Sequence, residues 1–106
     1  MKIDGVLACG AFIHGIPIET SASNEVDEEE LCAYAQDLIN YSRKVADGLG
    51  SRSEFVMLEM DDRKLIVLPI ESGGVVVLTD GDVNLGMVRM AIRNAISIFK
   101  SHLMEG

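Results

Sequence analysis

The chain has 106 residues, of which 48% are hydrophobic and 25% are charged, and its formal net charge is -8. A chain of this length buries about 60–65% of the surface that its unfolded form exposes, so we expect one domain over residues 1–106 that needs no metal or disulfide to fold. With 9 Lys and Arg against 17 Asp and Glu, the composition argues against nucleic-acid binding and against docking on acidic membranes. No apolar run reaches the roughly 18–20 residues of a membrane-spanning helix, so we expect no membrane insertion.

The two cysteines, Cys9 and Cys32, stand apart and lack the spacing of a metal site. Cys9 falls in an apolar strand-like run and Cys32 on the apolar side of a helix, which favours small buried thiols in a reducing compartment over a disulfide or redox pair. The chain begins with an acid before a short apolar run and lacks a convincing cleavage site. We therefore expect a cytoplasmic protein.

The first predicted elements are two paired strands. Residues 6–13 are apolar with small side chains, and residues 16–20 resume an extended pattern. His14 and Gly15 between them are typical of a tight turn, which favours a hairpin.

A long helix is predicted to begin after Asp27, because Asp27 followed by Glu30 resembles a capping box. Apolar residues then recur at helical spacing until Gly48 or Gly50 ends the helix. The apolar face is broader than one sheet requires, which points to a second contact surface such as another protomer; tyrosines at an ordinary core boundary are the alternative. The residues of the stripe and its tyrosine flank are Leu31, Tyr34, Ala35, Leu38, Tyr41, Ser42, Val45 and Leu49.

Three strands and a second helix are predicted in the second half, where apolar runs alternate with turn residues. The order strand, strand, helix, three strands, helix has hairpin-length connections, so it favours an antiparallel α+β sheet over a parallel doubly wound one. The strands cover residues 55–60, 64–70 and 75–79, with turns at 61–63 and 71–74, and the helix covers residues 85–103, with Leu85, Val88, Ile92, Ala95, Phe99 and Leu103 on its apolar stripe.

The turn before the second helix carries acidic residues that could be ligands of a metal ion. Asp80, Asp82 and Asn84 occupy the first, third and fifth places of a calcium-loop pattern. The pattern fails, because Leu85 stands where the sharp turn needs glycine and Ala91 where a bidentate acid is needed. We expect a structural junction without a metal, in which Asn84 caps the helix.

No catalytic motif is recognisable in the sequence. None of the lysines follows a glycine, as a phosphate-binding P-loop requires. The two histidines, His14 and His102, stand in a predicted turn and near the C-terminus, away from any serine or cysteine motif of known form. We therefore expect a protein that is not an enzyme and holds no cofactor.

Three cations form a local exception in this acidic chain. Arg89, Arg93 and Lys100 project in similar directions from the second predicted helix, beside its apolar stripe. They fit either an acidic partner surface or a solvated flank that nearby carboxylates such as Asp80 and Asp82 neutralise.

A family resemblance spans nearly the whole chain. The segments that carry it are Gly10-Ala11, Gly15-Ile16-Pro17-Ile18, residues 65–69 and above all Asn84-Leu85-Gly86 with Met87, Val88 and Arg89. On these segments the chain resembles the Roadblock family of dynein light-chain-type proteins, whose bacterial relatives include the gliding-polarity regulator MglB. We expect Gly86, which lacks a Cβ, to let the first turn of the last helix lie close against neighbouring backbone.

The resemblance implies a five-stranded antiparallel sheet in the order 2-1-5-4-3 between two long helices, a Roadblock/profilin-like α/β sandwich. The first helix is expected on one face and the last helix on the other. Family members often begin with a further helix, whereas here the first strand starts almost at Met1. The missing helix would leave part of one sheet face uncovered, with room for higher oligomers.

The third strand would then form an edge of the sheet. It is apolar on both sides and has no Lys or Pro to discourage pairing. In the family this edge pairs with the same strand of a second protomer, with the long helices side by side. The expected homodimer interface comprises Tyr34, Leu38, Tyr41, Val45, Phe55, Val56, Met57, Leu58 and Met60.

The resemblance also implies a function. Relatives regulate GTPases or serve as parts of scaffolds, so we expect a homodimer that binds a Ras-like small GTPase and biases its switch regions. Two other hypotheses stay open. One is a structural adaptor subunit like the dynein light chains, and the other is a small-ligand sensor domain.

Overall fold

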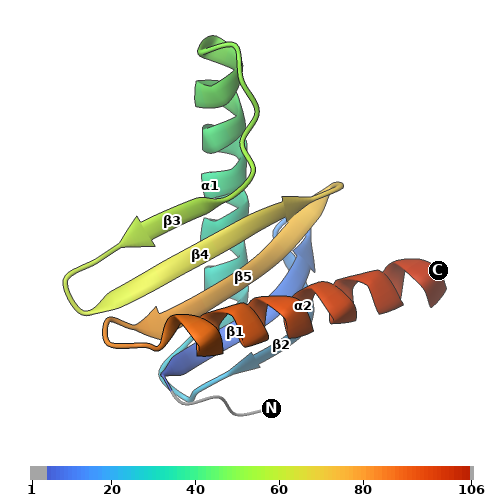
Figure 1. The fold of residues 1–106 in the computed structure, drawn as a ribbon. Helices are drawn as coiled ribbons and strands as arrows, with labels where there is room; N and C mark the ends of the chain where they lie inside the picture. Colours follow the sequence, from blue (N-terminus) through green and yellow to red (C-terminus); the bar gives the residue numbers. More distant parts are fainter. Residues whose placement is uncertain (1–4, 106) are drawn as a thin grey trace.

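Five strands and two helices make up the chain in the computed structural model, which describes residues 5–105 apart from the side chains of residues 85, 98, 99 and 102–105 (Figure 1). The predicted order of elements is confirmed. So is the tight turn at His14 and Gly15, where φ is 51° and 77°. The elements are β1 (Val6–Ile13), β2 (Ile16–Ala22), α1 (Glu28–Gly48), β3 (Val56–Glu59), β4 (Arg63–Ile70), β5 (Gly73–Asp80) and α2 (Leu85–Glu105).

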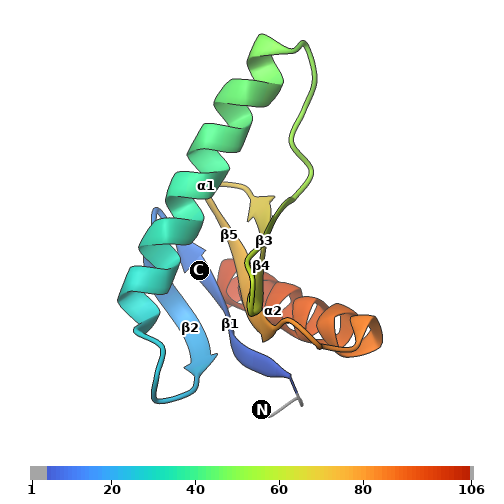
Figure 2. The ribbon, with the colours of Figure 1, turned by 90° about the vertical axis from the view of Figure 1, so that its left-hand side faces the viewer.

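The strands form one antiparallel sheet in the order β2-β1-β5-β4-β3. Helix α1 covers one face and α2 covers the other, so the sheet is the middle of three layers (Figure 2). Helix α1 contacts β2, β5, β4 and β3, whereas α2 contacts β1, β5 and β2. The predicted antiparallel α+β sandwich is therefore confirmed.

The hairpin between β4 and β5 is tighter than predicted. Gly73 and Gly74, which the sequence placed in the turn, belong to β5 and pair with β4. A Cβ on Gly73 would lie 1.9 Å from the carbonyl oxygen of Phe12. Glycine at this position is what allows β5 to pass so close to β1.

The core between α1 and the sheet comes from the first half of the helix. Cys32, Ala35 and Ile39 are fully buried, with Leu31 beside them, and they pack on Phe12 and on apolar residues of β4 and β5. Along the second half of α1 the apolar stripe leaves the sheet, because α1 crosses the sheet obliquely and extends beyond β3 (Figure 1). The residues of that stripe that are not buried are Leu38, Ser42, Val45 and Leu49.

Both cysteines are free and buried, as predicted. Burial raises the pKa of Cys9, and burial together with the negative charge of Glu28 raises the pKa of Cys32 to about 11. The two thiols therefore stay protonated at neutral pH.

Each helix begins with the predicted side-chain cap. Asp27 Oδ1 accepts a hydrogen bond from the amide of Glu30 at 3.1 Å, and Asn84 Oδ1 accepts one from the amide of Gly86 at 2.7 Å. The expected approach of Gly86 to neighbouring backbone is wrong. The atom nearest to a Cβ at this position would be Asn84 Oδ1, at 3.0 Å, so the glycine leaves room for the cap.

Helix α2 packs on the second sheet face through Val88, Ala91 and Ala95, which are buried, and Ile92, which is partly buried. They meet Ala11, Val75, Cys9 and Val77 of the central strands. Other predicted α2 residues have side chains outside the described part of the chain; they are Leu85, Phe99, His102 and Leu103.

Candidate functional site

The edge strand β3 is short and leaves large apolar side chains in solvent. It covers Val56–Glu59 where the sequence predicted residues 55–60, and it pairs with β4 alone. Phe55 is 58% exposed and Met57 53% exposed. Apolar surface of this kind on an open strand edge is a ready template for pairing with another strand.

Hydrogen bonding within the β3–β4 hairpin decides which amides of β3 remain free. The amide of Met60 donates to the carbonyl of Arg63 at 2.8 Å. In an antiparallel ladder hydrogen-bonded and non-hydrogen-bonded pairs alternate, so Leu58 and Val56 also bond to β4. The amide and carbonyl groups of Met57 and of the flanking odd-numbered residues therefore point to the open edge.

The second half of α1 projects past this edge (Figures 1 and 2). One flank of α1 carries Tyr34 and Tyr41, which are 56% and 67% exposed, the exposed Val45, and the partly buried Leu38, which packs against the core. A helix that leaves three large apolar residues in solvent has not buried its full apolar face. The apolar face of α1 is therefore wider than the part that packs against the core of this chain.

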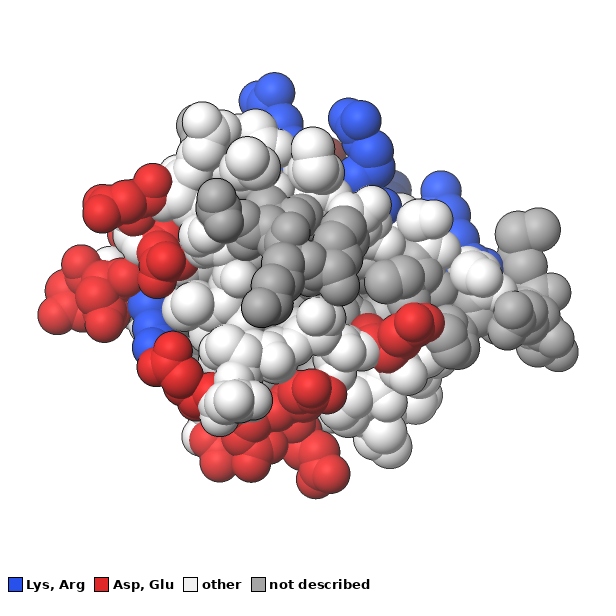
Figure 3. Space-filling view, turned by 90° about the horizontal axis from the view of Figure 1, so that it is seen from below, with Lys and Arg blue, Asp and Glu red and all other residues white. Residues whose placement is uncertain are grey.

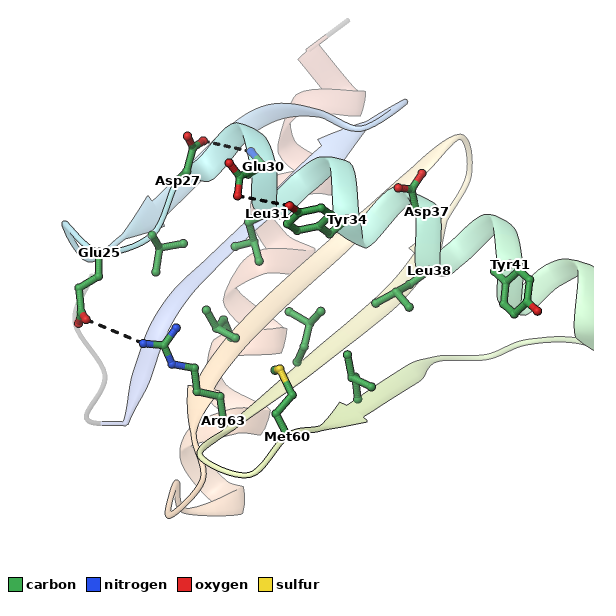
Figure 4. A pocket seen from close by; sticks show the side chains of 14 residues that line it. Glu25, Asp27, Glu30, Leu31, Tyr34, Asp37, Leu38, Tyr41, Met60 and Arg63 are labelled. Carbon is green, nitrogen blue, oxygen red and sulfur yellow. Dashed lines mark hydrogen bonds and ion pairs between the residues drawn. The ribbon is translucent and has the colours of Figure 1, made fainter.

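An apolar groove separates α1 from the β3–β4 edge (Figure 4). It encloses about 710 Å³. In Figure 4, Leu31 and Leu38 reach down from the helix and Met60 reaches up from the end of β3. The remaining apolar side chains of the groove are Val26, Tyr34, Tyr41, Leu58, Leu65 and Leu78.

Acidic side chains dominate the rim of the groove. Arg63, the one cation among the described residues that line it, forms an ion pair with Glu25 at 3.9 Å. Glu30 accepts a hydrogen bond from the hydroxyl of Tyr34 at 3.4 Å, while Asp37 lies further along the same helix (Figure 4). The groove thus offers apolar contact at its floor and negative charge at its rim.

The chemistry available in the groove is that of binding. Its charged groups are partly or fully exposed, and neither buried cysteine lines it. Within residues 5–105, as far as side chains are described, no three His, Cys, Asp or Glu side chains are grouped to hold a metal ion. A groove with an apolar floor and a charged rim can bind another macromolecule or an apolar ligand.

The structure brings the predicted interface residues together on one side of the molecule. Tyr34, Leu38, Tyr41, Leu58 and Met60 line the groove. The others lie next to it, along the projecting helix and the open edge; they are Val45, Phe55, Val56 and Met57.

The residues of the predicted family motif lie elsewhere. Asn84, Gly86 and Arg89 stand at the start of α2, and the side chain of Leu85 is outside the described part of the chain. Sequence reasoning missed the acidic rim. Glu30 and Asp37 lie seven residues apart on one helical row, a spacing that could have indicated it.

None of the helices, as far as the structure describes them, is long and apolar enough to cross a membrane.

Known proteins resemble the chain in sequence and in fold. The model of the Roadblock/LC7 domain family matches residues 13–80. An uncharacterised protein of Methanocaldococcus jannaschii is 30% identical over 88 residues, which are 82% of this chain and 75% of that protein. A Roadblock/LC7 domain from Streptomyces avermitilis superposes with a TM-score of 0.80 at 17% identity, covering 97% of this chain and 89% of its own. MglB from Myxococcus xanthus gives a TM-score of 0.69 at 21% identity, with 92% and 84% covered.

Proposed function

The chain belongs to the Roadblock/LC7 domain family, and on that premise we propose that it is a non-enzymatic homodimeric regulator or scaffold that binds a Ras-like small GTPase. The observation that supports the proposed dimer is that three exposed apolar features lie next to one another. An open strand edge, a projecting helix and an apolar groove lie side by side, and a two-fold axis at the edge satisfies all three (Figures 1 and 4). A regulatory function follows from the family resemblance.

The free amides favour one register for the shared edge. Phe55, Met57 and Glu59 present their backbone groups outward, and a two-fold axis at Met57 pairs Met57 with its own copy and Phe55 with Glu59 of the second copy. This register uses all three outward residues. It also keeps the two Glu59 carboxylates from facing each other, which would be unfavourable.

The same axis places the projecting half of α1 over the second copy. The exposed residues Tyr41, Val45 and Leu49 would then fill the groove of the partner copy, next to its own α1. Lys44 is exposed on this half of the helix, and Asp37 lines the rim that receives it. Their opposite charges favour the antiparallel pairing of the two helices.

Regulation of a GTPase by this dimer requires no nucleotide-binding residue of its own. Switch segments of small GTPases change between ordered and disordered states with the bound nucleotide, and a surface that holds one arrangement shifts that equilibrium. Because the sequence lacks a P-loop, we assign the chemistry of hydrolysis to the partner and the bias of its switch regions to this chain.

The test is a titration of the purified chain into Ras-like GTPases from the same organism, each loaded with GDP or with a non-hydrolysable GTP analogue. We expect at least one GTPase to bind, with a preference for one nucleotide state. Binding without such a preference supports a structural adaptor instead. Failure of every loaded GTPase to bind, together with a lysate pull-down that recovers none, contradicts the proposal.

The groove itself favours one alternative, a small-ligand sensor. An apolar cavity of about 710 Å³ with polar groups at its rim has the size and character of a ligand pocket. The alternatives separate in a thermal-shift screen with apolar amines at low protein concentration. Saturable stabilisation by such a ligand supports the sensor, whereas stabilisation by raised protein concentration alone supports the dimer.

A further inference from the structure

The outer face of α2 is a basic surface on an acidic protein. Arg89, Arg93 and Lys100 are all exposed and point within about 40° of one another, along roughly 16 Å of helix. No acid occurs in the sequence between Asp82 and Glu105. Neutralisation of the arginines by the acids before the helix, which the sequence suggested, is wrong, because no such ion pair occurs within the described part of the chain.

An apolar side chain accompanies these charges. Met90 is 52% exposed and lies beside the basic row, within about 100° around the helix of all three cations. Methionine adapts its shape to different partners, and arginine is enriched at protein interfaces. The like charges of Arg89 and Arg93, four residues apart, repel each other within the chain. Among the described residues these three cations have no hydrogen-bond or ion-pair partner, so they are free to contact another molecule.

The complementary surface lies on the opposite side of the sheet. In Figure 3 most Lys and Arg side chains follow one edge of the molecule, and Asp and Glu side chains gather along the opposite edge. Helix α1 starts on that acidic side with Asp27, Glu28 and Glu29. These acids line a hollow with Gly15, Pro17 and Ile16, and the Ile16 side chain is 67% exposed.

We infer that the basic face of α2 docks on the start of α1 in a second copy of this chain. Met90 of α2 then covers Ile16, and Arg89 and Arg93 face Glu28 and Glu29 of the neighbour. The two surfaces lie on opposite faces of the sheet, so one copy cannot satisfy itself (Figure 2). The contact is head-to-tail and leaves the β3 edge free, so it joins two-fold dimers into larger assemblies and does not depend on GTPase binding.

Net charge sets the conditions under which this contact forms. Two copies that each carry a net charge of -8 repel each other at long range. At 0.15 M salt this repulsion is screened, because charges more than roughly 8 Å apart interact weakly. Side chains that face each other directly at a contact are screened less. Raising the salt further to 1 M weakens the contact itself. We therefore expect association at 0.15 M salt that declines at 1 M.

The experiment is a charge exchange between two variants, followed by sedimentation over a concentration series at 0.15 M salt. Variant A carries Arg89→Glu and Arg93→Glu, and variant B carries Glu28→Lys and Glu29→Lys. In either variant alone, the contact brings side chains of the same charge to face each other. We therefore expect the dissociation constant of the head-to-tail contact to rise by roughly tenfold or more. An equal mixture of A and B restores opposite charges at every contact, so we expect assemblies larger than either variant forms alone.

Two control variants and one replacement variant keep the result interpretable. Arg52→Glu with Lys64→Glu changes the net charge as variant A does, but outside α2, and should leave the association intact. Met57→Lys disables the β3 edge and should leave the salt-sensitive contact in place. Because Glu28 accepts a hydrogen bond from Thr20, the single substitution Glu29→Lys replaces variant B if circular dichroism shows loss of folding.

Two outcomes overturn the inference. If variant A associates like the unmodified chain, the basic face is not a contact. If variant A loses association but the mixture does not recover it, the basic face meets a different acidic surface or another molecule.

Discussion

Met57→Lys should abolish the two-fold dimer while leaving the fold of each copy intact. Met57 is 53% exposed in the single chain, and surface substitutions at such positions change the free energy of unfolding by no more than about 0.5 kcal/mol. In the proposed dimer, however, the residue would sit on the two-fold axis opposite its own copy. One substitution therefore introduces two facing charges.

The expected loss of dimer stability has two parts. Two ammonium groups roughly 7 Å apart repel by about 1–2 kcal/mol at an effective dielectric constant of about 20–40. The apolar area that each Met57 would bury on dimerisation, about half of its side chain, contributes about 1 kcal/mol per copy. Together these give about 3–4 kcal/mol, which raises the Kd of the dimer several hundredfold.

Sedimentation equilibrium measures this Kd, and chemical denaturation checks the fold. Met87→Lys is a control, because Met87 is 36% exposed but lies on α2, away from both the β3 edge and the basic row. It should leave the two-fold dimer unchanged. An unaltered Kd for Met57→Lys, with both variants folded, would refute the edge-strand model.

Three further predictions concern stability, each measured by urea denaturation. Asp27→Ala removes the cap whose oxygen accepts from Glu30 at 3.1 Å and should lower the free energy of unfolding by about 1 kcal/mol. Gly73→Ala places a Cβ at 1.9 Å from Phe12 O and should cost more than about 2 kcal/mol, whereas Gly48→Ala, with nothing within 4 Å, should be neutral or stabilising. The pKa of Cys32 is raised from 9.0 to about 11, so the unfolded chain loses this proton at a lower pH than the folded one. The stabilisation that Cys32 contributes below pH 9 should decline by up to about 1.4 kcal/mol per pH unit toward pH 11. Cys32→Ala should remove this part of the slope and leave the part that comes from the raised pKa of Cys9.

Local chemistry made most of the fold predictable. Asp27 and Asn84 cap their helices as the sequence indicated, because a cap depends on residues within one helical turn. The β4–β5 turn was misplaced because its position depends on contacts that are distant in sequence. Gly73 is a residue type that is common in turns, but it is needed here because of Phe12, which lies next to it only in the folded sheet.

The candidate site was only partly predictable. Helical spacing identified Tyr34 and Tyr41 as surplus to the core, since periodicity reveals which side of a helix is apolar. It could not reveal that α1 crosses the sheet obliquely, and that crossing exposes Val45 and opens the groove above Leu65 and Leu78. The crossing of a helix over a sheet is set by packing across many side chains, so it has no local signature.

Amide hydrogen exchange, read residue by residue at several protein concentrations, tests the shared β3 edge most directly. The amide of Met57 points to the open edge and that of Leu58 points to β4. We predict that protection of the Met57 amide rises with concentration in step with dimerisation, while protection of the Leu58 amide stays constant. A Met57 amide that exchanges freely where sedimentation finds a dimer would place the interface elsewhere and contradict the account.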